Sequence, residues 1–276
     1  MTDEKKDKII EEINKKPRVI LGLDVSTACI GATILVDDGD DKPKIAKITH
    51  YSPKVSRKIK GIEALFLRKR QFADEFLKGL TEYYITDVVI EEPLLSSNNV
   101  NTVATLLRFN GMISDSVYEI LGLVPHFISS YDARMFSFPD LMALRKYNKK
   151  GEVYPEKHII TSAKKDHLVL FGAYPFDVDK KVVMMNKVND MYKDIDWIFD
   201  KKGELKKENF DACDSLVCAL AYVNINRHGI EKPTLTKKPI EIEETDTSKI
   251  IKYTVSVWDR NYNKEIDLDK EITQEQ

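Results

Sequence analysis

The 276-residue sequence has few cysteines, few glycines and no long apolar run. Its three cysteines, Cys29, Cys213 and Cys218, show no metal-type pairing, and their odd number argues against a disulfide scaffold. We therefore expect a reducing compartment. No apolar run reaches the roughly 18 residues that a membrane span needs. The first 16 residues lack the apolar core and small-residue cleavage site of an export signal, so we expect a cytoplasmic protein.

Positive and negative charges nearly cancel, since 43 Lys and Arg stand against 45 Asp and Glu, for a formal net charge of −2. Proteins that bind nucleic acid are often basic, but this total conceals two local excesses. Residues 54–70 hold seven basic residues and one acid (+6), and residues 145–165 hold seven and two (+5). Most charge runs are solvated faces, so these stretches predict phosphate contacts only beside a site with matching chemistry.

Apolar periodicity predicts an α/β domain in the first half of the chain. The expected strands are 18–24, 29–36, 44–51, 85–93 and 124–130, and the expected helices are 56–84 and 99–121. Short turns join the first three strands, which is typical of an antiparallel meander. Each helix then leads into a further apolar strand, as a crossover to a parallel strand does. The sequence thus predicts a five-stranded mixed sheet, three antiparallel strands and then parallel ones, flanked by helices.

The second half of the chain is less regular. The expected elements are a helix at 156–171, a strongly apolar helix at 210–228, a charged linker at 231–247 and a strand at 250–259. We interpret residues 138–155 and 177–209 as insertions. The expected organisation is a charged arm over 1–16, one globular domain over 17–228 and a C-terminal extension over 229–276.

Four acids stand where such a sheet brings element ends together. Asp24 ends the first strand and Glu91 the fourth, and Asp211 and Asp214 open the last helix on one face. Each acid alone has an ordinary explanation, as a helix-capping residue or as strand-end polarity. Four together repel one another unless cations neutralise them, and hard divalent cations prefer oxygen ligands. Two Mg²⁺ ions roughly 4 Å apart would polarise a phosphodiester, activate a water and stabilise the leaving oxygen.

Three motifs resemble, in order and context, the acidic motifs of the RuvC family of Holliday junction resolvases: LGLDVSTACIGATIL, VVIEEP and FDACDSLVCALAY. The segment LLRFNGMISDSVYEILGLVPHFISSYDAR is similar to the family's helix and fifth strand. The resemblance covers about residues 18–137 and 156–228. It implies an RNase H-like fold and identifies the domain over 17–228 as a nuclease domain with insertions.

The resemblance also implies roles for individual residues. The implied catalytic and metal-binding residues are Asp24, Glu91, Asp211 and Asp214. In the family they hold two Mg²⁺ ions per active site, with Mn²⁺ as a substitute. Alignment on the apolar strand favours Glu91 over Glu92 as the ligand.

Contacts with DNA are expected from the loop after the glutamate, which in the family enters the junction. The candidate DNA-binding residues, including those of the basic stretches, are Ser96, Ser97, Asn98, Arg134, Lys164, Lys165, Lys58 and Arg68. The alternative for the loop PLLSSNNVN is an ordinary solvent loop in which Asn98 or Asn99 caps the next helix. The family works as a homodimer, because paired nicks need paired sites. Helix 99–121 is the expected dimer surface, unless its apolar face serves only the core.

The resemblance therefore implies a Mg²⁺-dependent, structure-selective endonuclease that resolves four-way DNA junctions by symmetric paired nicking, at a nucleoid or a viral replication site. A less selective branched-DNA nuclease or an RNase H-like nuclease is the near alternative. An actin- or sugar-kinase-like ATPase shares the sheet order, but it needs further Gly-rich motifs, and this chain has 11 glycines and no Gly-Gly pair. A catalytically inactive DNA-binding protein is the last alternative, and the presence of all four acids argues against it.

Overall fold

The structure is a computed structural model of the whole chain. It describes residues 16–93, 99–138, 144–145, 158–161, 169–170, 180–229, 234–244, 248–259 and 264–267. The chain forms two compact units, the first made of Met1–Ala133 and Val188–Val223, the second of Arg134–Lys187 and Asn224–Gln276. The expected arm over 1–16 lies outside the described residues, apart from its last residue. Among the helices of the described residues, none is long and apolar enough to cross a membrane.

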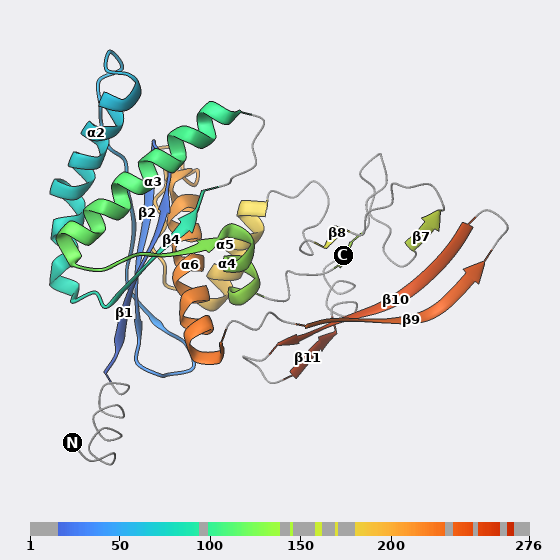
Figure 1. Cartoon of the computed structure of the whole chain (residues 1–276). Coiled ribbons are helices and arrows are strands. Elements are labelled where there is room, and N and C mark those ends of the chain that lie inside the picture. Colours follow the sequence, from blue (N-terminus) through green and yellow to red (C-terminus); the bar gives the residue numbers. More distant parts are fainter. Residues whose placement is uncertain are drawn as a thin grey trace, which may run out of the picture. The chain divides into compact units, whose positions relative to one another are not determined.

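The first unit is built on the mixed sheet that the sequence predicts (Figure 1). Its strands are β1 (Arg18–Val25), β2 (Ile30–Asp37), β3 (Lys44–Tyr51), β4 (Asp87–Glu92) and β5 (His126–Ser129). Their order in the sheet is β3-β2-β1-β4-β5. Strands β1 to β3 pair antiparallel, whereas β4 pairs parallel with both β1 and β5. This order and these directions confirm the expected RNase H-like fold class.

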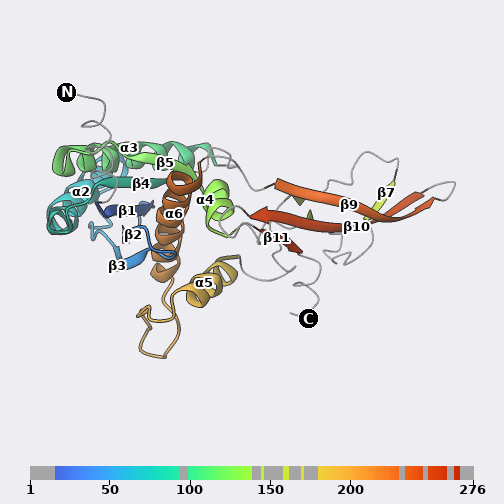
Figure 2. The same ribbon diagram turned by 90° about the horizontal axis from the view of Figure 1, so that it is seen from below.

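Helices cover both faces of the sheet (Figure 2). One face carries α2 (Gly61–Gln71), the π-helical turn η1 (Phe72–Phe76), the 3₁₀ segment η2 (Leu77–Tyr83) and α3 (Val100–Leu121). The other face carries α6 (Glu208–His228). The core under the first group of helices consists of Leu21, Leu23, Val25, Ile30, Ala32, Ile34, Val88 and Ile90 from the strands, and Leu65, Phe72, Leu77, Leu80, Phe109, Ile113 and Val117 from the helices. Alternation along each strand therefore turns the intervening residues toward α6.

Two glycines allow α6 to lie directly on the second face of the sheet. A Cβ atom on Gly22 would stand 2.2 Å from the backbone oxygen of Ser215, and one on Gly31 would stand 1.9 Å from that of Asp211. Any other residue at either position would collide with helix backbone, which cannot give way as a side chain can. Gly31 lies opposite Asp24 in the β1–β2 register. The start of α6 is thus held against the sheet beside Asp24.

The helix expected over 56–84 begins later in the structure, at the first residue of α2. Gly61 has a φ of +63°, in the left-handed region, so a right-handed helix cannot continue back through it. The helical segment then widens into the π-helical turn η1, tightens into the 3₁₀ segment η2 and ends before Tyr84, whose φ is +52°.

The second unit corrects two further expectations. Its strands are β6 (Leu144–Arg145), β7 (His158–Thr161), β8 (Val169–Leu170), β9 (Thr234–Glu244), β10 (Ser248–Asp259) and β11 (Lys264–Asp267). The helix expected over 156–171 was wrong where the residues are described, because β7 pairs with β10 and β8 with β6. The linker expected over 231–247 was also wrong, because β9 pairs with β10 along most of its length. Backbone pairing with distant strands decides both segments, and local periodicity does not reveal it.

Two more helices, α4 (Ser130–Ser137) and α5 (Lys180–Met191), complete the described elements. The segment after α5 belongs to the first unit. Within this unit, the Tyr192 hydroxyl donates to the Pro43 carbonyl at 2.8 Å. Buried Asn209 bonds both backbone groups of Ile198, accepting from its N–H at 3.0 Å and donating to its carbonyl at 2.7 Å. The Asn209 contacts hold the first turn of α6, two residues before Asp211.

Gly31→Ala tests the close approach of α6. The added methyl group must displace helix backbone, so we expect a loss of about 1–3 kcal/mol in the free energy of unfolding. Gly111→Ala is the matched control, because a Cβ on Gly111 meets nothing within 4 Å in the exposed part of α3. Alanine there should be neutral or stabilise by roughly 0.5–1 kcal/mol. Urea unfolding measures both, and equal stabilities of the two variants would contradict the packing described.

Candidate active site

Three of the four predicted acids come together at the carboxyl end of the sheet. Asp24, Glu91 and Asp214 each offer a carboxylate oxygen, and these oxygens lie within 4.8 Å of one another. Asp214 is buried, with 8% of its surface exposed, and the other two are half-buried. Three carboxylates this close, partly removed from water, are the donor set that hard divalent cations prefer.

Strand register explains why these acids meet. In the parallel β1–β4 pair, Leu23 stands opposite Ile90, so the next residues, Asp24 and Glu91, are neighbours on the face toward α6. Glu92 follows on the other side of the strand and is exposed. The three acids that meet thus include Glu91, as the alignment of the apolar strand favours, and not Glu92.

Hydrogen bonds of Ser215, the next residue of α6, fix the position of Asp214. The hydroxyls of Ser215 and Thr33 are 2.8 Å apart, and Ser215 also donates to the Ala212 carbonyl at 2.7 Å. Both hydroxyl-bearing residues are fully buried. One turn after Asp214, the Cys218 thiol lies 3.8 Å from a carboxylate oxygen of Glu91 and donates to it. Sequence reasoning did not anticipate these contacts, although Asp214, Cys218 and Tyr222 recur every four residues, which puts them on one helix face.

Asp211 is not one of the three acids that meet, although it is half-buried on the preceding turn of the same helix. Its carboxylate accepts a hydrogen bond from the buried thiol of Cys29. Burial is the main cause that raises the pKa of Cys29 to about 12. A hydrogen bond with Ser52 opposes this rise, whereas the hydrogen bond and charge of Asp211 and the charge of Glu208 add to it. The thiol is therefore protonated at neutral pH and is a hydrogen-bond donor here, not a thiolate ligand.

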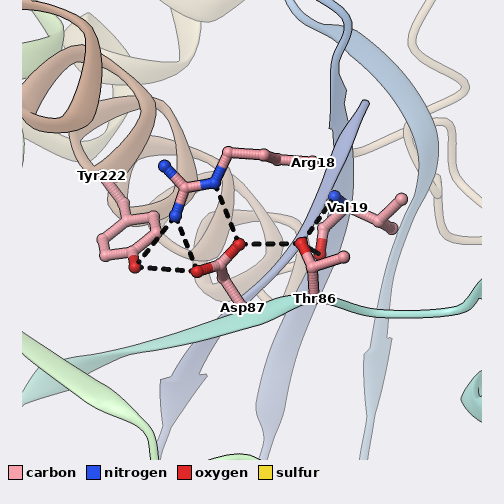
Figure 3. Close-up of polar contacts among 5 residues, drawn as sticks. All are labelled: Arg18, Val19, Thr86, Asp87 and Tyr222. Carbon is pink, nitrogen blue, oxygen red and sulfur yellow. Dashed lines mark hydrogen bonds and ion pairs between the residues drawn. The ribbon is translucent and has the colours of Figure 1, made fainter. Parts of the chain in front are cut away.

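A second polar cluster lies at the other end of the same face (Figure 3). Arg18 donates to both carboxylate oxygens of Asp87, at 2.7 and 3.2 Å, and Tyr222 donates to one of them at 3.0 Å. Thr86 donates to Asp87 at 2.7 Å and to the Val19 carbonyl at 3.2 Å. The cluster joins β1, β4 and α6, and it fixes the helix two turns beyond Asp214. A search for catalytic motifs misses Arg18, Thr86 and Asp87, because they are polar residues at strand starts.

Burial by itself would raise the pKa of Asp87, but hydrogen bonds from Arg18, Thr86 and Tyr222 and the charge of Arg18 outweigh it. The net result is a pKa below the ordinary value of an aspartate. A carboxylate with a lowered pKa stabilises the folded state when it is ionised.

The predicted DNA-binding residues are distributed as follows. Lys58 is exposed in the segment before α2, and Arg68 is half-buried within that helix. Arg134 lies in the last turn of α4, in the second unit. The remaining candidates, Ser96, Ser97, Asn98, Lys164 and Lys165, lie outside the described residues. Asn99 caps α3, because its side chain accepts from the N–H groups of Asn101 and Thr102, as one alternative anticipated.

Comparison with known proteins finds similarity in structure only. No protein-family model matches the chain, and no curated protein matches it. Thermus thermophilus RuvC, solved with a Holliday junction substrate, is 14% identical with a TM-score of 0.48, covering 79% of this chain and 99% of that chain. The yeast mitochondrial Holliday junction resolvase Ydc2 is 11% identical with a TM-score of 0.46, covering 81% and 88%. An Aquifex aeolicus member of the Ppx/GppA family is 12% identical with a TM-score of 0.31, covering 62% of this chain and 54% of that chain.

The first two of these proteins are of the class whose acidic motifs the sequence resembles. All three TM-scores are below 0.5. The strand order and register define the fold independently of them.

Asp87→Asn tests the lowered pKa through the pH dependence of stability. The unfolded carboxyl titrates near pH 3.9, and the folded one titrates below it. The stability that ionised Asp87 contributes is therefore complete above about pH 5 and is lost as the pH falls through the folded pKa.

We expect wild type to be more stable than Asp87→Asn near neutral pH, with the difference shrinking as the pH falls below about 4. Urea unfolding at a series of pH values measures the difference. A difference that stays constant down to the lowest pH at which both proteins fold would contradict this account of the Asp87 cluster.

Proposed function

We propose that the chain is a divalent-metal-dependent endonuclease that resolves four-way DNA junctions. The supporting observation is the meeting of Asp24, Glu91 and Asp214 within 4.8 Å at the carboxyl edge of an RNase H-like sheet. Three neighbouring carboxylates repel one another where water is partly excluded, and a bound cation would offset this repulsion. A protein gains from this arrangement if it binds cations there.

In this proposal the three carboxylates hold a divalent cation, with Mg²⁺ as the physiological ion and Mn²⁺ as a substitute. Asp211, one turn earlier on α6, contributes to holding a second ion. Bound divalent ions would supply Lewis-acid polarisation of a phosphodiester and a hydroxide nucleophile at neutral pH. The residues of this chain supply the fixed geometry, because α6 packs directly on the sheet at Gly22 of β1 and Gly31 of β2.

Junction resolution by paired nicks requires two such sites, so we propose a homodimer. Support for α3 as its surface comes from three large apolar residues exposed along this helix. Val100 is 77% exposed, Leu107 43% and Tyr118 59%. The proposed DNA contacts from elsewhere in the chain are Lys58, Ser96, Ser97, Asn98, Arg134, Lys164 and Lys165. They follow the resemblance and the basic stretches of the sequence.

Cleavage of a synthetic four-way junction in the presence of Mg²⁺ tests the proposal. Wild type should cut the junction and leave linear duplex and RNA–DNA hybrid largely intact. Asp24→Asn, Glu91→Gln and Asp214→Asn should each lower the rate of cleavage at least 100-fold, because each removes a charged ligand of the ion. Glu92→Gln is the matched control, since it alters the neighbouring exposed carboxylate and should keep the wild-type rate.

The same assay separates the alternatives. Equal cleavage of linear duplex would leave a nuclease without junction selectivity, and preferential cleavage of the hybrid would indicate an RNase H-like activity. A supercoiled plasmid with an extruded cruciform distinguishes paired nicks, which linearise it, from single nicks, which relax it. Binding without any Mg²⁺-dependent cleavage, or full activity of Asp24→Asn, would contradict the proposed function.

A further inference from the structure

A cavity of about 380 Å³ opens on the α2–α3 side of the sheet, between the β1–β2 turn, the start of α2 and the first half of α3. Three of its lining residues are cationic, namely Lys60, Arg68 and Arg108. Thr27 and Thr105 add hydroxyl groups. None of the described residues that line it is acidic. A concave site with this lining selects an anion.

Arg68 distinguishes this cavity from an ordinary basic surface. Its Nε atom is buried and has no hydrogen-bond partner among the described residues. The two basic residues that follow it on α2 form ion pairs with acids. Lys69 pairs with Asp115 and Glu119 at 3.2 Å each, and Arg70 pairs with Asp74 at 3.5 Å. A buried donor without an acceptor costs free energy, and the charge of an anion bound in the cavity that Arg68 lines would offset part of this cost.

The start of α2 adds a second attraction for an anion. The first N–H groups of a helix lack partners within the helix and carry the positive end of its dipole. Lys60 stands at the N-cap position of α2, and its side chain makes no capping hydrogen bond. Lys60, Gly61 and Ile62 all line the cavity. The first residues of α2 and two arginines therefore line the same cavity, a combination that is typical of phosphate sites at helix starts.

The cavity lies close to the acidic centre along the chain. Thr27 follows Asp24 by three residues, so their Cα atoms are at most roughly 11 Å apart. The side chain of Asn110, on α3, donates to the Val25 carbonyl at 3.4 Å and ties this helix to the end of β1. Successive phosphates of one DNA strand are spaced at about 3.4 Å along the helix axis. A DNA strand that passes from the acidic centre round the carboxyl end of β1 would bring another phosphate to the cavity.

We propose that this cavity binds one backbone phosphate of the strand being cut, a few nucleotides from the cleaved phosphate. This inference rests on the proposed nuclease function and adds a positioning site to it. Arg68 and Arg108 form ion pairs with the phosphate oxygens, and the start of α2 completes the site. Because phosphate contacts carry no sequence information, the cavity sets the position of the strand over the acids and not the choice of bases.

The test measures how binding of a four-way junction depends on salt. All variants carry Asp24→Asn, so that binding is measured without cleavage. Neutralising one phosphate contact lowers the slope of log Kd against log salt by about 0.9. Arg68→Gln and Arg108→Gln should each show part of this decrease and bind roughly tenfold more weakly. The double variant should lose about 0.9 in all and not twice that, because both arginines hold one phosphate.

Arg70→Gln is the matched control, since it removes the same charge two residues further along α2, where the side chain is 80% exposed and paired with Asp74. It should change the slope much less than either test variant. Arg108 is exposed, so Arg108→Gln keeps the test valid should Arg68→Gln fold poorly. Wild-type slopes for both test variants, or an effect of Arg70→Gln as large as theirs, would overturn the proposal.

Cleavage by the wild-type protein separates the two possible failures. If wild type cuts junctions but the slopes do not respond to Arg68 and Arg108, only the phosphate cavity is wrong. If wild type cuts no nucleic acid, the nuclease function itself is wrong. A normal rate of cleavage by Arg68→Gln/Arg108→Gln at low substrate concentration would also contradict a positioning role.

Discussion

The contact between α6 and the sheet is the constraint on which the rest of the site depends. At Gly22 and Gly31 the helix backbone lies where any Cβ atom would be, so the helix cannot move closer, and other side chains would push it away. This distance brings Asp214, from the far end of the sequence, to within 4.8 Å of Asp24 and Glu91. A shift of about 1 Å between the two elements would be enough to degrade a catalytic geometry.

On this face of the sheet, close packing and electrostatic repulsion oppose each other. Close packing gathers carboxylates whose repulsion increases as water is excluded. The Arg18–Asp87–Tyr222 cluster at the other end of the face is a compensated arrangement, in which a half-buried carboxylate has a cation and two hydroxyl donors. At the acidic centre, three carboxylate oxygens meet within 4.8 Å of one another. In the proposed function an external cation offsets their repulsion, whereas the Asp87 cluster at the other end is a structural contact.

Much of the fold was predictable, because it depends on local patterns. Three apolar runs before a helical period predicted the meander, and the alternation of strand and helix predicted the parallel part of the sheet. Asp24, Glu91 and Asp214 were predictable from strand ends and helix spacing. The approach of α6 at Gly22 was not, since nothing in a single strand reveals which backbone lies over it. The pairing of β7 and β9 with β10 was missed for the same reason: distant partners decide it. Arg68 was identified as basic, but only the cavity distinguishes it from Arg70.

The most direct test of the central claim is a crystal structure of the protein grown with Mn²⁺, with anomalous diffraction used to locate the ion. The account predicts an anomalous peak bound by carboxylate oxygens of Asp24, Glu91 and Asp214, at the roughly 2.0–2.2 Å typical of such small divalent ions. The same experiment on Asp214→Asn should show the peak lost or strongly reduced. A wild-type crystal with no peak among these three carboxylates, at Mn²⁺ concentrations that support activity, would contradict the account.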